Sequence, residues 1–295
     1  MKAFDCITAH DTAHAVALLA EHGASARLLA GGTDLLVDLK STLDGPRVVI
    51  DVSRVEELKG IRLEDDALRI GALVTHAEIM RSALIRSLCP VLQEAAHTIG
   101  AVQTRNLGTL GGNLVTCVPS MDSGPALVAL DATVTIAGPA GRSRLPLERF
   151  FVGPRTTALK DGELLVDIRI PRSNLKKPLA FLKFGLRKGQ ALALVNVAAG
   201  FRIDPYKSAF RAPCIALGAV APTVIRARKA EHYLEGRAIG AEAMAEAARI
   251  AVTEAKPISD FRASAAYRRA LIEVLTRRAL EQTAERARTA QEEAA

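Results

Sequence analysis

Two glycine pairs are the residues of this chain whose types and spacing suggest chemistry. Gly31-Gly32 lies between apolar residues and is followed by Thr33 and Asp34, and Gly111-Gly112 lies in a similar setting before Asn113. Glycine in an apolar stretch costs backbone entropy and adds no packing, so it indicates a close backbone approach or a positive φ. Successive amide N–H groups there would suit an anion, and we predict a phosphate. The plainer alternative is two tight turns of an α/β domain.

The first glycine run, residues 30–36, must be positioned by the helices and strands on either side of it. Hydrophobic periodicity predicts a helix, a strand, a short helix and a second strand at residues 11–22, 27–30, 35–40 and 46–52. Thr33 and Asp34 would then lie in the first turn of the short helix, where N–H groups and the helix dipole favour an anion. The first run is therefore expected to open a helix that faces a ligand.

The remaining elements alternate between short strands and helices. Thr75 is expected to cap a helix over 76–84, with His76 as a surface or helix-start residue and His97 packed in a second helix over 88–98. Neither histidine has a partner at metal-ligand spacing. Beyond a proline-rich boundary near 171–178 we expect three antiparallel strands at 179–184, 192–203 and 211–220, helices at 239–255 and 267–288, and a polar tail past about 285.

The composition excludes several classes of protein. Aromatic residues make up 4% and Trp is absent, which argues against a stacking groove for carbohydrate or single-stranded nucleic acid. The net charge is +7, but the densest basic stretch, 226–229, is too short for a nucleic-acid arm. It is expected to be a solvated face, with an acidic protein partner as the alternative.

The cysteines and the N-terminus indicate a reducing compartment. Four widely spaced cysteines form no CxxC pair, so we expect reduced thiols and neither an iron–sulfur cluster nor a structural zinc. No apolar signal core and no apolar run of membrane-spanning length is present. We expect a cytoplasmic protein without stable membrane insertion.

Familiar nucleotide and catalytic motifs do not account for the glycine runs. Neither run fits the P-loop pattern or the GxGxxG dinucleotide fingerprint. GxSxG, HExxH and paired catalytic His and Cys residues are also missing. We therefore predict no catalytic side chain and no metal ligand within this chain.

Five segments, in order, resemble the FAD-binding (medium) subunit of the molybdenum hydroxylase family, which includes carbon monoxide dehydrogenase and xanthine dehydrogenase. Residues 30–36 and 105–114 resemble the two FAD loops of the family, and residues 119–127 resemble its S-P-x-x-D-x-x-P-x-L stretch. Residues 183–187 resemble the strand beside the flavin, and residues 258–268 resemble the signature of the C-terminal domain. Val118-Pro119 replaces the usual Ser-Pro, and Phe181 stands where some relatives have tyrosine.

The resemblance implies an α+β fold with a two-subdomain FAD-binding domain of the p-cresol methylhydroxylase (PCMH) type and a C-terminal α+β domain. The C-terminal domain would hold a three-stranded antiparallel sheet with helices. A length of 295 residues agrees with about two domains. The expected boundaries are 1–175 for the FAD domain, with subdomains of about 1–56 and 57–175, then 176–288 for the C-terminal domain and 289–295 for a tail.

The resemblance also implies the residues that hold FAD. The first run would wrap the diphosphate and the second run would close the other side. Asp122 would hydrogen-bond the ribityl chain or the adenosine ribose, and Lys183 would approach the flavin ring. The residues expected to bind FAD are Leu28, Leu29, Ala30, Gly31, Gly32, Thr33, Asp34, Leu35, Ile99, Gly100, Gly108, Thr109, Gly111, Gly112, Asn113, Val115, Asp122 and Lys183.

The implied function is electron transfer in an oxidoreductase. Electrons would come from a molybdopterin-containing large subunit through a [2Fe–2S] small subunit, reduce FAD and pass to an external acceptor. The implied assembly is a dimer of heterotrimers. The flavin would carry the chemistry while the protein supplies position and electrostatics. Two alternatives remain open, a stand-alone FAD-dependent oxidase or dehydrogenase of the PCMH superfamily and a nucleotide-free scaffold.

Overall fold

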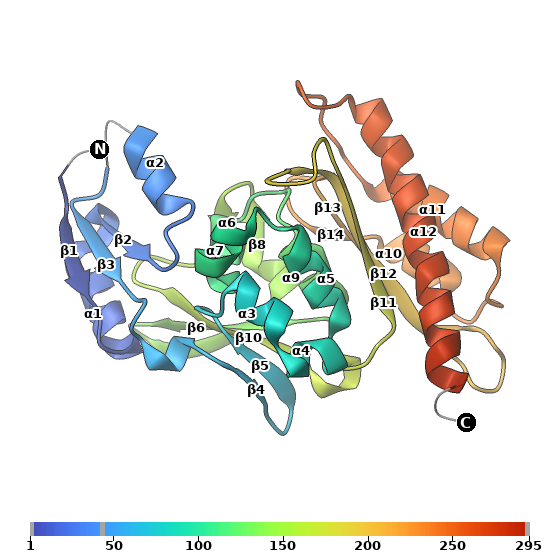
Figure 1. Ribbon diagram of the computed structural model, residues 1–295, viewed down its shortest axis with the longest axis horizontal. Coiled ribbons are helices and arrows are strands. Elements are labelled where there is room, and N and C mark those ends of the chain that lie inside the picture. Colours follow the sequence, from blue (N-terminus) through green and yellow to red (C-terminus); the bar gives the residue numbers. More distant parts are fainter. Residues whose placement is uncertain (1–2, 42–44, 293–295) are drawn as a thin grey trace.

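Three sheet-based units follow one another along the chain. The computed structural model describes residues 3–41 and 45–292. Figure 1 shows the N-terminal unit at the left, a middle unit of sheet and helices, and a C-terminal unit at the right. Three clusters of buried apolar side chains are centred on the three units, and two of them include side chains of the next unit along the chain. The described residues thus form an α+β protein, as expected.

The N-terminal unit is a three-stranded parallel sheet in the order β1-β3-β2. The Asp11 side chain caps α1 by accepting a hydrogen bond of 2.7 Å from the His14 amide, and Gly23 ends the helix with φ of 52°. Ala15 and Leu18 of α1 pack with Ile50 in the core. The elements are β1 (Asp5–Thr8), α1 (Thr12–His22), β2 (Ala26–Leu29), α2 (Leu35–Ser41) and β3 (Val48–Asp51).

The middle unit is a five-stranded antiparallel sheet in the order β4-β5-β10-β6-β7, with α3 to α7 on one side of it in Figure 1. Thr75 and Glu78 form a capping box at the start of α3. The elements are β4 (Ile61–Leu63), β5 (Ala67–Gly71), α3 (His76–Arg81), α4 (Ala83–Leu88), α5 (Pro90–Thr98), α6 (Val102–Leu107), α7 (Leu110–Thr116), α8 (Ser123–Ala129), β6 (Thr133–Gly138), β7 (Gly141–Pro146), α9 (Leu147–Phe150), β8 (Phe151–Gly153), β9 (Thr156–Thr157) and β10 (Leu164–Pro171).

The predicted helix over 76–84 is wrong in its length. α3 stops at Arg81 because Ser82 adopts an extended conformation and caps α4 through its side chain. His76 begins α3 but is buried, and His97, which was expected to pack, is exposed.

The C-terminal unit has a four-stranded antiparallel sheet in the order β11-β12-β13-β14, one strand more than expected. The helices α10, α11 and α12 cover its outer side in Figure 1, while α5 and α8 of the middle unit contact its inner strands. The elements are β11 (Leu179–Gly185), β12 (Ala193–Ile203), β13 (Phe210–Gly218), β14 (Ile225–Arg226), α10 (Arg228–Leu234), α11 (Ala241–Glu254) and α12 (Ala265–Glu292).

Two further expectations about this unit are wrong. α12 extends to Glu292, so the expected tail is helical up to that residue, and residues 293–295 lie outside the described range. Arg226 of the basic stretch is not solvated, because it is buried and pairs with Glu231 at 2.5 Å and with Asp131 at 2.8 Å. Its charge therefore serves packing between β14, α10 and α8.

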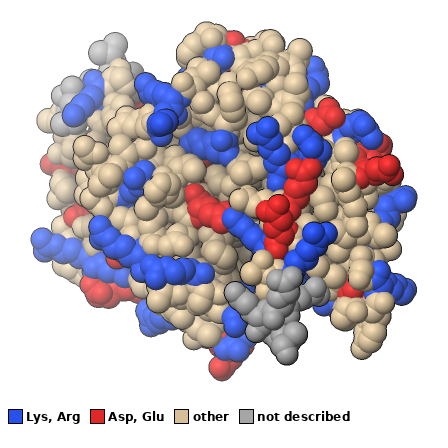
Figure 2. Space-filling view, turned by 45° about the vertical axis from the view of Figure 1, so that its right-hand side comes forward, with Lys and Arg blue, Asp and Glu red and all other residues tan. Residues whose placement is uncertain are grey.

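The surface charge is mixed on the face seen in Figure 2. On the right-hand part of that face, Lys and Arg lie among Asp and Glu. Within the described residues, no helix combines the length and the apolar character needed to cross a bilayer. Three of the four cysteines are buried and Cys6 is exposed, and all four are free.

Candidate cofactor-binding site

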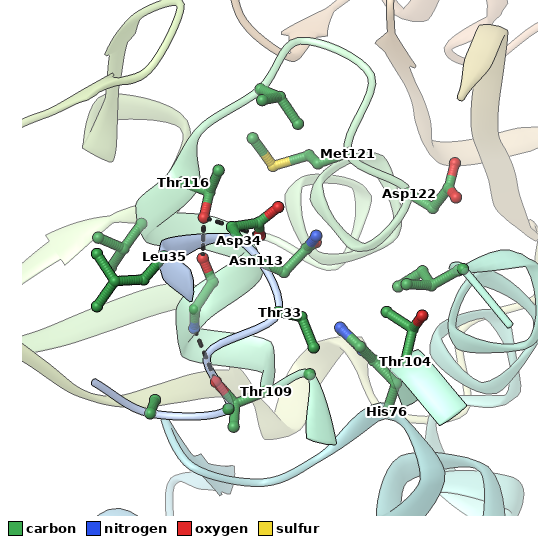
Figure 3. A pocket seen from close by; sticks show the side chains of 18 of the residues that line it. Thr33, Asp34, Leu35, His76, Thr104, Thr109, Asn113, Thr116, Met121 and Asp122 are labelled. Atoms are coloured by element: carbon green, nitrogen blue, oxygen red, sulfur yellow. Dashed lines mark hydrogen bonds between the residues drawn. The ribbon is translucent and has the colours of Figure 1, made fainter. Parts of the chain in front are cut away.

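The fold brings the two glycine runs into direct contact. A Cβ placed on Gly31 would lie 1.9 Å from the Leu107 carbonyl oxygen, so only glycine allows this approach. Gly32 has φ of +70°, a left-handed conformation that side chains disfavour. Thr116 of α7 donates a hydrogen bond of 3.3 Å to the Asp34 carboxylate, which joins the runs a second time (Figure 3). Both reasons expected for the glycines therefore apply at the first run.

A cavity of about 440 Å³ lies between the runs and reaches the middle and C-terminal units. All residues expected to bind FAD line it except Leu29, Gly111 and Lys183. Gly111 instead packs against Ala72, where a Cβ would lie 2.7 Å from the Ala72 side chain. The lining residues are Leu28, Ala30, Gly31, Gly32, Thr33, Asp34, Leu35, His76, Ile99, Gly100, Thr104, Gly108, Thr109, Gly112, Asn113, Val115, Thr116, Val118, Ser120, Met121, Asp122, Gln190, Ala191 and Leu192.

The first run presents free backbone donors. Among residues 3–41 and 45–292, no hydrogen bond uses the amide N–H groups of Gly31, Gly32, Thr33 or Asp34. Four successive unpaired amides on a cavity wall form the kind of concave donor surface that binds anions.

The amide N–H groups at the glycine pair of the second run are already hydrogen-bonded to other groups of the protein. Leu110 and Gly111 donate to the Val74 and Ala72 carbonyl groups at 2.8 and 2.9 Å, and the Gly112 amide donates to Thr109 Oγ1 at 3.0 Å. The expectation of an amide nest is thus wrong for this run. Its glycines serve close packing and the capping of α7 by Thr109.

The second run still offers a side-chain donor to the cavity. Ser123 donates a hydrogen bond of 2.6 Å to the Asn113 side-chain oxygen, so the Asn113 NH₂ group remains for a ligand. Thr33 and Asn113 both line the cavity, and Figure 3 shows their side chains close to each other. The two runs therefore offer the cavity neutral side-chain donors.

Asp122 connects the cavity to a buried ion pair. Its carboxylate accepts hydrogen bonds from Lys183 Nζ at 2.5 Å and from the Asn196 amide at 2.8 Å, and Lys183 also donates to the Thr98 carbonyl at 3.0 Å. The exposed fractions of the Lys183 and Asp122 side chains are 8% and 6%. Burial raises the pKa of Asp122 above its ordinary value, while the adjacent ammonium favours the charged form. Lys183 thus lies behind Asp122 rather than on the cavity wall.

Sequence reasoning missed His76 as a cavity residue. Its side chain is only 2% exposed and lines the cavity. Burial, followed by the charge of Arg105, lowers the pKa of His76 to about 4, so the imidazole is neutral near pH 7. A histidine at the start of a helix gives no periodic signal of burial, because the cover comes from α6 and the second run.

The other missed residues come from α6, from α7 and from two loops. Thr104 and Thr116 line the cavity from α6 and α7, and the loop residues close it toward the C-terminal unit; these are Val118, Ser120, Met121, Gln190, Ala191 and Leu192. Among the described residues, no group of three or more His, Cys, Asp or Glu side chains is arranged to hold a metal ion. The cavity therefore offers donors for an anionic organic ligand.

Comparison with known proteins assigns the family. Residues 2–173 match the family model described as "FAD binding domain in molybdopterin dehydrogenase", and residues 180–283 match the one described as "CO dehydrogenase flavoprotein C-terminal domain". The carbon monoxide dehydrogenase medium chain of Hydrogenophaga pseudoflava is 34% identical over 270 residues, which cover 90% of this chain and 92% of the relative. The 6-hydroxypseudooxynicotine dehydrogenase complex subunit alpha of Paenarthrobacter nicotinovorans is 33% identical over 98% of this chain and 97% of its own length.

Solved structures agree with this assignment. A carbon monoxide dehydrogenase structure from Hydrogenophaga pseudoflava superimposes with a TM-score of 0.92, at 34% identity over 97% of this chain and 98% of that chain. Quinoline 2-oxidoreductase from Pseudomonas putida 86 gives a TM-score of 0.91 at 31% identity, covering 97% of this chain and 99% of that chain. The resemblance inferred from five segments is confirmed, as is FAD as the cofactor. The chain belongs to the FAD-binding subunits of the molybdenum hydroxylase family.

Proposed function

We propose that this chain is the electron-transfer flavoprotein of a heteromeric molybdenum hydroxylase. Electrons enter from a [2Fe–2S] small subunit, which receives them from a molybdopterin-containing large subunit, and they leave FAD for an external acceptor. One large subunit, one small subunit and this chain form one heterotrimer, and two heterotrimers form the assembly. The observation that carries the proposal is the agreement with a carbon monoxide dehydrogenase chain over 97% of the length at a TM-score of 0.92.

The cavity fits a dinucleotide whose diphosphate is bound by neutral groups. None of the described residues that line the cavity is Lys or Arg, so the unpaired amides of the first run are the donors for the phosphate charges. Gly31 and Gly32 leave that backbone bare, as close approach to a diphosphate requires. We propose that the diphosphate lies against residues 31–34. The other predicted FAD-binding residues that line the cavity would contact the other parts of FAD.

Asp122 is the proposed acceptor for hydroxyl groups of FAD. Bound FAD supplies the redox chemistry, because its ring takes up and releases electrons. Lys183 and Asn196 hold the two Asp122 oxygens from behind, which fixes the carboxylate and balances its charge. Lys183 thereby acts on FAD through Asp122, as a positioning residue.

The proposed docking face for the [2Fe–2S] subunit adjoins the cavity. A second hollow of about 370 Å³ shares Ser120 and Leu192 with the cavity and includes Ile258 on its wall. Ile258 is 68% exposed and the neighbouring Phe261 is 89% exposed. Exposed apolar patches mark protein interfaces. Electron transfer requires the two redox groups to be close, so a partner covering this face would be well placed.

Purification of the tagged full-length chain from its native host tests the proposal. We expect FAD, molybdenum and iron to elute together with two further subunits, and the flavin absorbance to bleach when the complex receives its substrate. A yellow chain that elutes alone, without molybdenum or iron, and oxidises an alcohol or amine would support the stand-alone oxidase instead. A colourless chain would support the scaffold.

A further inference from the structure

His76 is a buried cavity side chain that the proposed function leaves without a role. Its Nδ1 atom is inaccessible and has no hydrogen-bond partner within the described residues. Buried polar groups nearly always have a partner, since an unpaired one loses its hydration without replacement. The apoprotein therefore keeps a destabilising group at this position.

The imidazole lies where the two glycine runs meet. The His76 amide donates a hydrogen bond of 3.1 Å to the Gly108 carbonyl. A Cβ on Gly108 would lie 3.5 Å from both the His76 ring and Thr33 Oγ1, so the three residues adjoin one another. Figure 3 shows the His76 ring beside Thr33 with a nitrogen directed into the cavity.

The surroundings favour a neutral donor at this point. Arg105 is the nearby cation, but its guanidinium already donates to the His97 and Ile99 carbonyl groups at 3.2 and 2.8 Å. Neither Arg105 nor any other Lys or Arg of the described residues lines the cavity. The buried imidazole, uncharged near pH 7, carries one N–H that can point toward an anion.

We propose that His76 is a positioning residue for FAD, with its cavity-facing ring nitrogen donating a hydrogen bond to the diphosphate beside Thr33. The inference rests on the proposed placement of the diphosphate against residues 31–34. The bond gives the cavity-facing nitrogen of the imidazole a partner in the holoprotein, while the inaccessible Nδ1 atom keeps none among the described residues.

The test compares FAD affinity with apoprotein stability in His76→Leu. Leucine has a similar size and no polar atom, so the apoprotein should melt at or above the wild-type temperature. A hydrogen bond to a charged group is lost, so the dissociation constant for FAD should rise about 10- to 100-fold. His76→Gln, which restores an N–H donor, should recover most of the affinity. Flavin fluorescence quenching and thermal unfolding of the full-length chain give the two readouts.

His97→Leu is the matched control, because it makes the same change at an exposed histidine outside the cavity, and it should bind FAD normally. Unchanged FAD affinity in His76→Leu would overturn the inference. A parallel loss of apoprotein stability and affinity in both His76 variants would assign His76 a structural role only. A complex that lacks molybdenum and iron would refute the subunit role without affecting this comparison, which measures FAD binding alone.

Discussion

Gly31 makes the closest backbone approach between the two runs. Replacement by alanine would force its Cβ to within 1.9 Å of the Leu107 carbonyl oxygen, and backbone atoms must then move. We expect Gly31→Ala to destabilise the fold by about 1–3 kcal/mol and to weaken FAD binding at least about tenfold. Urea unfolding and FAD titration measure the two effects.

Gly189→Ala provides the control for this change. At Gly189 no atom of residues 3–41 or 45–292 lies within 4 Å of the added methyl group, and the φ of Gly189 is not in the left-handed range. This variant should match the wild type in both measurements. Equal behaviour of the two alanine variants would show that the close approach at Gly31 is not needed.

His76 should also make apoprotein stability depend on pH. Its pKa is lowered from 6.5 to about 4 in the folded chain, so the unfolded chain binds the proton more readily between these values. Stability should therefore fall as the pH is lowered from about 6.5 to 4, by up to about 3 kcal/mol from this group. Urea unfolding of the apoprotein at several pH values should show a shallower decline in His76→Leu than in wild type. Parallel pH profiles would contradict the expected burial of a neutral imidazole.

Predictions for single residues were correct where the backbone conformation at that residue requires glycine. Glycine in an apolar setting indicated the close approach at Gly31 and the positive φ at Gly32. The same reasoning could not separate the free amides of the first run from the paired amides of the second. That difference depends on the carbonyl groups of Val74 and Ala72, which lie far from Gly111 along the chain.

At the scale of elements, the ion pair between Asp122 and Lys183 joins the start of α8 to the C-terminal sheet. Lys183 on β11 and Asn196 on β12 both bind the Asp122 carboxylate. Lys183→Met would leave a buried unpaired carboxylate and should cost about 3–5 kcal/mol of folding free energy. The double variant Lys183→Met with Asp122→Asn should be less unstable than the sum of the two single variants. Additive effects in a urea double-mutant cycle would show that the pair is not coupled.

Predictions of where a helix begins were accurate where the capping residue by itself determines the start of the helix. The cap at Thr75 was expected from sequence and is present. The break at Ser82 was missed because a capping serine inside an apolar pattern does not change the helical period. The short strand β14 was missed because two residues carry no periodicity, and only pairing with β13 defines them.

At the scale of the whole molecule, the apolar side chain of Phe261 should serve assembly. Phe261→Asp changes a side chain that is 89% exposed, so the free energy of unfolding and FAD affinity should hardly change. The partner subunits should no longer copurify at wild-type yield. Tyr206→Asp alters another exposed aromatic side chain, on the β12–β13 turn, and should leave assembly intact. Normal copurification of the Phe261 variant would place the docking face elsewhere.

The overall architecture was predictable only through the five matched segments. Periodicity alone suggested strands and helices, but not that residues 31–34 and 107–116 share one cavity, because such contacts join segments that are distant in the chain. The cavity also includes residues 190–192, which come from beyond the expected domain boundary. Its completion thus depends on the packing of the C-terminal unit, which no local pattern encodes.

The central claim is that FAD binds with its diphosphate on the bare backbone of the first glycine run. The most direct test is an experimental structure of the full-length chain with FAD. We expect the diphosphate oxygens to lie within hydrogen-bonding distance of the amide nitrogens of residues 31–34, with the second run on the opposite side. A cofactor whose diphosphate lies away from these amides would contradict it.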